Sequence, residues 1–438
     1  MPTAQGPSAA VGRGGVARCY NVGVPRAWLG VLGERDFRLF FTGYLVSLVG
    51  GEMVPVAVVF AILDQGGSAT EVGFVLAAQT VPLAVLLLVG GVVADRLPRR
   101  ALMIGADVVR AASQGTLAAL LLLGRPVLWE YMVLLGVVSA GWAFFSPAMT
   151  GLIPQLTSAA RLQQANSWSG LAGSVAQIAG PAAGGALVAV VSPGWAIAAD
   201  AVSYLISASC LAMVSAPLTR VIRDSSSSFF CDLRLGWQEF RSRTWLWLVT
   251  AQSALRWLLV MGMFTVLGAV VAKADLGGAG AWGAILAASG AGAVVGGLVL
   301  LRLEPRRPLA VAVAATLLFV APLALLAVHA PAEIVAAGAF VGGGGLAVFS
   351  TLWQTTLQRE VAPEMLSRVS AYEWLGTVAS APVGYAIVGP LARVLGVPGT
   401  LWLSVGVLVA ITVPGLVMPS VTGLRASHPD NRPPAYTP

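Results

Sequence analysis

The sequence predicts an all-α membrane protein with twelve transmembrane helices in two six-helix halves. Composition gives the first reason, because 57% of the 438 residues are hydrophobic, 10% are charged and the mean hydropathy is +0.83. Such values lie outside the range of soluble globular domains. A second reason is that apolar segments of about 20 residues, each long enough to cross a bilayer, recur along the chain. The third is an internal repeat that relates the two halves.

Twelve apolar segments are expected to cross the membrane, six on each side of a polar stretch. They are 38–63, 72–93, 101–123, 128–150, 168–191, 195–217, 245–271, 281–301, 309–329, 333–356, 370–392 and 398–418. The expected domains are a tail over 1–36, a half over 37–217, a linker over 218–243, a half over 244–418 and a tail over 419–438.

The basic residues predict the orientation of these spans. Of the 26 Lys and Arg residues, 21 fall in tails and loops that are cytoplasmic if the N-terminus is inside, and three fall in outer loops. The positive-inside rule therefore places both termini in the cytoplasm. The net charge of +7 follows the membrane topology, so we do not expect a nucleic-acid partner.

Four charges are packed into the turn between the second and third spans. It reads Gly90-Gly91-Val92-Val93-Ala94-Asp95-Arg96-Leu97-Pro98-Arg99-Arg100. Three arginines suit a cytoplasmic turn, but topology gives no reason for the carboxylate of Asp95. One interpretation is a gating element made of Gly91, Asp95, Arg96, Arg99 and Arg100. The alternative is a charged turn that only sets topology.

The spacing Gly91-x3-Asp95-Arg96-x2-Arg99-Arg100 resembles the signature between helices 2 and 3 of the major facilitator superfamily of transporters. That family usually has glycine where this chain has Pro98. The resemblance implies that Asp95 meets the start of the eleventh span, around Ser367 to Ser370, and holds the cytoplasmic side closed in the outward-open state. Unpaired N–H groups at a helix N-terminus would attract the carboxylate.

The internal repeat aligns this turn with a second copy over 296–307. Allowing one inserted residue, eight of eleven positions are identical. Two halves repeated in parallel about an axis along the membrane normal are a known layout of membrane transporters. The second copy has Leu301 where the first has Asp95, and this asymmetry favours a functional role for the acid.

A second motif lies in the fifth span and reads Gly180-Pro181-Ala182-Ala183-Gly184-Gly185. Proline kinks a helix and glycines let a neighbour approach closely. The motif resembles the antiporter signature of drug/proton exporters, through Gly180, Pro181, Gly184 and Gly185; ordinary helix packing is the alternative. Likeness along nearly the whole chain suggests the 12-span subgroup with macrolide-efflux and siderophore-export proteins. Many proton-coupled exporters carry an arginine in the fourth span, but this chain has none over 128–150.

Ionisable residues inside spans are costly and mark candidate sites. Glu52 lies near the middle of the first span, and Arg256 lies near the middle of the seventh, one turn after Gln252. We expect Glu52 and Arg256 to form a switchable pair facing the axis between the halves, in which Glu52 takes a proton. The alternative is a static structural ion pair.

Three further ionisable residues lie in the spans of the first half. Asp107 and Arg110 are three residues apart in the third span, so we expect them to pair with each other. Asp200 lies about one turn into the sixth span, where we expect it to cap a helix end.

Tyr44, Trp353 and Gln354 are candidates for the wall of a substrate cavity, because aromatic and polar side chains occur there within spans. Interface belts and lipid packing are the alternative. No His/Cys/Asp cluster or nucleophile–base pair appears in the spans. We therefore expect no metal, no cofactor and no enzymatic activity.

Together these features predict a monomeric exporter in the bacterial plasma membrane. It would expel a bulky apolar or amphipathic small molecule by alternating access, with protons as the coupling ion. Two alternatives stay open: a facilitator or importer of a small solute, and a non-transporting membrane sensor or assembly factor on the same scaffold.

Overall fold

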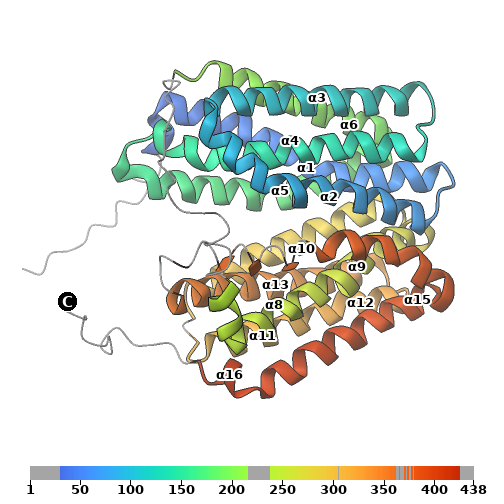
Figure 1. Cartoon of the computed structure of the whole chain (residues 1–438). Coiled ribbons are helices and arrows are strands. Elements are labelled where there is room, and N and C mark those ends of the chain that lie inside the picture. Colours follow the sequence, from blue (N-terminus) through green and yellow to red (C-terminus); the bar gives the residue numbers. More distant parts are fainter. Residues whose placement is uncertain are drawn as a thin grey trace, which may run out of the picture.

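The computed structural model describes residues 30–215 and 237–424, except 304, 362–364, 366–368, 371, 374, 375 and 378. Within these residues the chain is helical and contains no strand, which confirms the all-α prediction. Eleven of the described helices are long and apolar enough to cross a membrane. Figure 1 shows them as two bundles lying side by side, one for each half of the sequence.

The first bundle consists of six long helices. They are α1 (Arg35–Asp64), α2 (Ala69–Arg96), α3 (Arg99–Leu123), α4 (Leu128–Leu156), α5 (Leu162–Val190) and α6 (Pro193–Ala212), with short turns η1 (Val31–Gly33) and η2 (Ala159–Arg161). Prolines interrupt the hydrogen bonding inside α1, α2, α4 and α5. Ser68 and Glu71 form a capping box that fixes the start of α2, with the Ser68 N–H donating to Glu71 over 2.6 Å.

The second bundle is more broken. Its seventh span runs through α8 (Thr244–Arg256), the π-helix η3 (Trp257–Met261), α9 (Gly262–Val271) and the π-helix η4 (Ala272–Leu276). The remaining elements are α10 (Ala279–Leu300), α11 (Pro308–Ala315), η5 (Thr316–Phe319), α12 (Val320–Ala327), α13 (Ala332–Glu360), α15 (Ser380–Val417) and α16 (Pro419–Thr422). The π-helix η3 begins directly after Arg256, and π-helical turns in other proteins often lie at functional sites.

Helix α15 is two helices joined at a kink. It has 38 residues, and Gly396 within it has φ +72° and ψ +167°, a conformation that glycine adopts readily. The expected spans 370–392 and 398–418 therefore meet here without a loop. Because part of 370–392 lies outside the described residues, the count of twelve stays a prediction.

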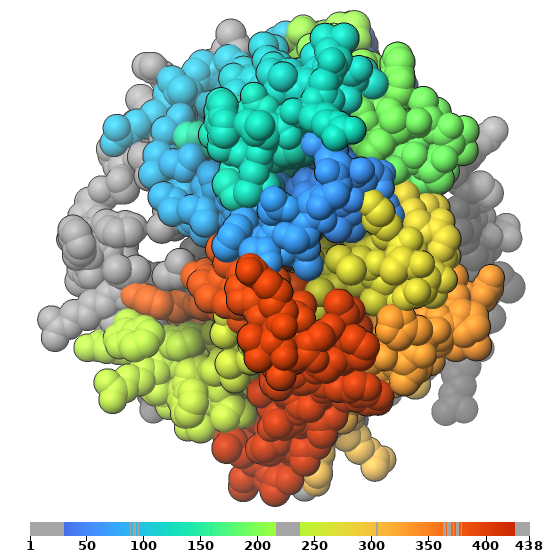
Figure 2. Space-filling model, turned by 90° about the vertical axis from the view of Figure 1, so that its right-hand side faces the viewer, coloured from blue at the N-terminus to red at the C-terminus, as the bar shows by residue number. Residues whose placement is uncertain are grey.

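The two ends of the bundles are named here by residues. The Asp64 end is where α1 connects to α2, and the Arg96 end is where α2 connects to α3. Figure 2 views the molecule from the Asp64 end, where blue atoms of the first half lie against yellow and red atoms of the second.

Contacts between the halves gather toward the Asp64 end. The Lys273 ammonium lies 2.7 Å from the Asp64 carboxylate. Arg393 on α15 donates to the Thr70 hydroxyl on α2 over 3.0 Å. A side chain at Gly185 on α5 would begin 2.6 Å from the carbonyl oxygen of Ala279, the first residue of α10. Backbone-to-backbone approach of this kind needs residues without side chains.

Some predicted features fall where the structure makes no statement. Residues 1–29, 216–236 and 425–438 lie outside the described part, and so do most of the expected tails and linker. Within the expected linker, residues 237–242 are helical.

Candidate functional site

The glycine motif of α5 packs against two different helices. A side chain at Gly184 would begin 2.9 Å from the backbone of Met53 on α1. Gly185 lies against Gly283 of α10, and Pro181 has its carbonyl oxygen against the same glycine. The motif thus joins α1 on one side to the opposite half of the molecule on the other.

Glu52 lies at this junction. Gly180 of α5 is in direct contact with the Glu52 backbone and Cβ, so no larger residue fits there without a shift of the helices. Glu52 itself is half-buried, and within the described part of the chain its carboxylate has no hydrogen-bond or ion-pair partner. An ionisable group in this position inside a membrane helix is costly and marks a functional candidate.

Arg256 lies in a cluster within the second half. Its guanidinium is 4.3 Å from the centre of the Phe349 ring on α13, a cation–π arrangement. It also interacts electrostatically with Glu373, which accepts a hydrogen bond of 3.3 Å from the Trp353 indole N–H. Arg256 is 8% exposed and Glu373 is half-buried. A positive charge, a negative charge and two aromatic side chains therefore lie close together in this cluster.

Glu52 and Arg256 are not paired in this conformation. Among the described residues no ion pair joins them, and the acid that interacts with Arg256 is Glu373. A pair between Glu52 and Arg256 in another conformation stays a prediction. The Gln252 amide, one turn before Arg256, donates instead to the Ile411 carbonyl oxygen of α15.

The three expected cavity residues are placed differently from one another. Tyr44 is 8% exposed and stacks on Phe40, with ring centres 5.5 Å apart, inside the first half. Trp353 is buried in the Arg256 cluster, whereas the next residue, Gln354, is exposed. Trp353 and Gln354 therefore do not share a wall here.

Two arginines of the turn between α2 and α3 donate hydrogen bonds to other helices of the first half. Arg99 donates to the Gly151 carbonyl oxygen of α4 over 2.6 Å. Arg100 donates to the carbonyl oxygens of Leu211, over 2.8 Å, and Ala212. These are the final carbonyls of α6, where a cation is favourable.

The structure gives less information on the other expected gating residues. Arg96 is exposed at the end of α2. Gly91 and Asp95 lie in helical backbone, but their side chains are outside what the structure describes, as are Ser367 and Arg368 at the proposed docking point. The latch between Asp95 and the eleventh span stays a prediction.

A buried polar cluster joins α3 and α6 within the first half. The expected pair of Asp107 and Arg110 is confirmed. The expectation that Asp200 caps a helix end is wrong, because α6 begins after Ser192 and Asp200 is 0% exposed. The Gln114 amide of α3 donates to Asp200 over 2.8 Å. Periodicity places a residue on a helix but does not reveal which partner helix faces it.

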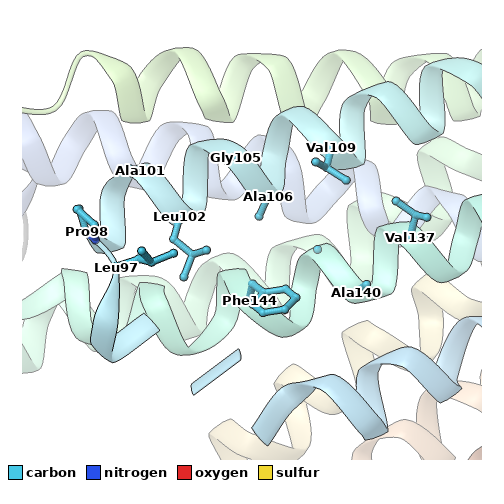
Figure 3. Close-up of a pocket in the computed structure, with 11 residues that line it drawn as sticks. Leu97, Pro98, Ala101, Leu102, Gly105, Ala106, Val109, Val137, Ala140 and Phe144 are labelled. Atoms are coloured by element: carbon cyan, nitrogen blue, oxygen red, sulfur yellow. The ribbon is translucent and has the colours of Figure 1, made fainter. Parts of the chain in front are cut away.

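A separate apolar groove lies between α3 and α4, as Figure 3 shows. Its volume is about 470 Å³, and its walls include Leu97, Pro98, Val109, Val137 and Phe144. It belongs to one half only and includes none of the ionisable residues described above. It is therefore not the candidate site.

Sequence reasoning missed Glu373. The signal was available, because Glu373 is an ionisable residue within the expected span 370–392. Its partnership with Arg256 needed the structure, since the two residues are 117 positions apart and nothing in the sequence relates them.

The fold and these buried charges are those expected of a polytopic membrane transporter built from two helical bundles. The profile of the Major Facilitator Superfamily matches residues 40–372, and the chain belongs to this family. It is similar to Macrolide efflux protein A of Streptococcus pyogenes, with 29% identity over 181 residues, which are 41% of this chain and 45% of that protein. The chain thus spans less than half the length of the first curated relatives that it matches.

Two further similarities cover most of the chain. The Multidrug efflux pump Tap of Mycolicibacterium fortuitum is 26% identical over 381 residues, 81% of this chain and 89% of that protein. The crystal structure of the nucleoside transporter NupG superposes with a TM-score of 0.69 at 12% identity, over 87% of this chain and 98% of that one. The likeness to NupG concerns the fold alone.

Proposed function

We propose that this transporter exports a bulky apolar or amphipathic small molecule from the bacterial cell by alternating access, in exchange for protons. Family membership establishes a transporter, and the similarity to a macrolide efflux protein and to a multidrug efflux pump supports the direction and the substrate class. The arginine count supports an Arg96 end that faces the cytoplasm.

The observation that carries alternating access is a difference along α5. Toward the Asp64 end, Gly185 and the Pro181 carbonyl oxygen lie against Gly283 of α10, in the other half of the molecule. Toward the Arg96 end, Gly170 and Gly173 have no neighbouring atom within 4 Å of where a side chain would begin. The halves are therefore packed at one end of α5 and separated at the other, as expected for a conformation open to the Arg96 side.

The open stretch of α5 also carries polar groups. Asn166 and Ser167, near the start of α5, are exposed. Asn166 and Gly170 are four residues apart, so they lie on the same face of α5. We assign this face of α5 to the route of the substrate from the Arg96 end.

Two half-buried carboxylates could exchange protons during transport. Glu52 lies beside the α5 motif and Glu373 beside Arg256, so each half brings one acid. Loss of a proton from either acid would create a charge that attracts a cationic substrate, and uptake would release it. Arg256 stays charged throughout and would be freed when Glu373 is protonated.

The test is drug susceptibility in a pump-deficient bacterial host with and without this protein, using macrolides and amphipathic dyes. Gly185→Ala gives a structural check, because its new methyl group would press on the backbone of α10. Overpacking of this kind costs about 1–3 kcal/mol, so resistance should fall at least fivefold. The matched control is Gly170→Ala on the same helix, where there is open space. No resistance to any compound from a well-expressed protein would contradict export, and equal effects of the two variants would contradict the packed-end assignment.

A further inference from the structure

The charge of the buried cluster in the first half does not balance. Asp107 and Asp200 bring two carboxylates and Arg110 brings one guanidinium, and all three residues are at most 1% exposed. An uncompensated charge in a membrane bundle is unfavourable by several kcal/mol. Something in the functioning protein must supply one more positive charge.

The two carboxylates have different partners. Asp107 forms an ion pair with Arg110 on the same helix. Asp200 is held by neutral groups: Gln114 donates to one oxygen over 2.8 Å and the Ser203 hydroxyl lies 3.3 Å from the other. Asp200 is therefore the acid whose negative charge lacks a bonded cation.

The cluster also contains unused polar atoms. Asp107 Oδ2, Arg110 Nε and Gln114 Oε1 are buried without a hydrogen-bond partner in the described part of the chain. A buried polar atom without a partner costs about 1–3 kcal/mol. Rotating the Gln114 amide by half a turn would place its oxygen where its nitrogen now lies. Gln114 could then accept from a protonated Asp200 as readily as it now donates to the carboxylate.

The surroundings of Asp200 are closed to other charges. Arg110 on α3 and Tyr204 on α6 are the titratable groups that act on it, and Asp107 in turn acts on Tyr204. From α1 the residue facing it is Gly50, where a side chain would begin 2.7 Å from the Asp200 carboxylate. From α4 the rings of Trp142 and Phe145 lie over the Arg110 guanidinium, with ring centres at 5.6 and 4.6 Å.

We propose that Asp107 and Asp200 together bind one exchangeable proton, carried by Asp200, and that this cluster is a proton site of the first half in addition to Glu52. In the loaded state a proton is bound to an Asp200 oxygen and the net charge is zero. In the empty state that O–H bond is broken, the proton has left to water, and the cluster is negative. No other covalent bond changes, and the hydrogen bond between Gln114 and Asp200 reverses its direction.

The position of α1 links the charge state of Asp200 to the contact between the two halves. Gly50 lies against Asp200 on one face of α1, whereas Glu52 and Met53 lie against the α5 motif on another. Helix α5 in turn contacts α10 of the second half. A change in charge at Asp200 would alter the packing of α6 against α1. A resulting displacement of α1 would then change the packing of α5 against α10. This coupling rests on the proposed proton exchange, whereas the proton site itself does not.

Infrared spectroscopy of the full-length protein in lipid vesicles tests the site without any substrate. At neutral pH the wild type should show the carbonyl band of a protonated carboxyl group. Asp200→Asn and Asp107→Asn should each lose that band and stay folded, because each leaves one acid facing Arg110. Glu333→Gln, at an exposed acid in the first turn of α13, is the control and should keep it. In vesicles with an imposed pH gradient, Asp200→Asn should lower proton-driven efflux at least tenfold.

Three results would overturn the proposal. One is a band that survives in both Asn variants. A second is a wild type without the band whose melting temperature rises with NaCl but not with choline chloride, which would assign the charge to sodium. The third is failure of both Asn variants to accumulate, since the proposal requires the neutral cluster to be stable. Absence of efflux from a wild type that retains the band would instead count against the exporter function alone.

Discussion

The two halves each bury an arginine against aromatic side chains of their fourth helix, yet the surroundings differ. Arg110 is 1% exposed, lies over the rings of Tyr204 and Phe145, and shares its cluster with two acids. Arg256 lies over Phe349 and interacts with one acid, Glu373, which is half-buried. The first cluster is sealed, so only a proton or small ion can change its charge. The second pairs one acid with one arginine and is more accessible, so we expect a substrate to compete for its charges.

Removing Arg110 should give the largest effect. Arg110→Gln leaves two buried carboxylates without a counter-charge, a change that typically costs about 3–5 kcal/mol. We expect the variant to fail to accumulate in the membrane, as measured by immunoblot and by size-exclusion chromatography in detergent. The double variant Asp107→Asn/Arg110→Gln should restore folded protein, because it removes one charge of each sign. Normal accumulation of Arg110→Gln alone would mean that the cluster does not need its cation.

Glu373→Gln in the second cluster should have a smaller effect than Arg110→Gln in the first. It removes the acid that interacts with Arg256, but Arg256 keeps its contact with Phe349 and is not fully sealed. We expect a folded protein whose efflux falls about tenfold, which corresponds to about 1.4 kcal/mol.

Two variants calibrate that result. Glu52→Gln should also fold and lose pH-driven exchange while still binding substrate. Glu333→Gln, an exposed acid in the first turn of α13, should have no effect. Failure of Glu373→Gln to accumulate would show that the Arg256 cluster is as sealed as its counterpart.

The repeated turn offers a smaller contrast between the halves. Asp95→Asn should lose most transport, about fivefold, because a carboxylate at a helix N-terminus is worth up to about 1 kcal/mol at an exposed site. Leu301→Ala at the matching position should transport normally, since Leu301 is 80% exposed at the end of α10. Efflux rates at matched expression levels are the measurement. Equal tolerance at both positions would leave the turn with a topological role only.

The sequence alone predicted the helices well and their partners poorly. Length and apolarity locate a membrane helix, so most expected spans have a counterpart among the described helices. Arg110 and Asp107 were also predicted correctly as a pair because they lie on one helix, where spacing fixes proximity.

Partners on different helices were not predictable in this way. Asp200 meets Gln114 across 86 residues, and Arg256 interacts with Glu373 instead of pairing with Glu52 in this conformation. Which faces meet depends on the crossing of helices. That crossing is set here by single glycines such as Gly50 and Gly180, whose contacts become visible only in three dimensions.

The most direct test of alternating access is a reversible cross-link at the Asp64 end. Asp64→Cys and Lys273→Cys replace an ion pair between the halves with two thiols, in a background without the native cysteines Cys19, Cys210 and Cys231. A short, cleavable thiol cross-linker should hold that end closed and abolish efflux of a compound found in the susceptibility screen, and reductant should restore it. Unchanged efflux from fully cross-linked protein would contradict the account.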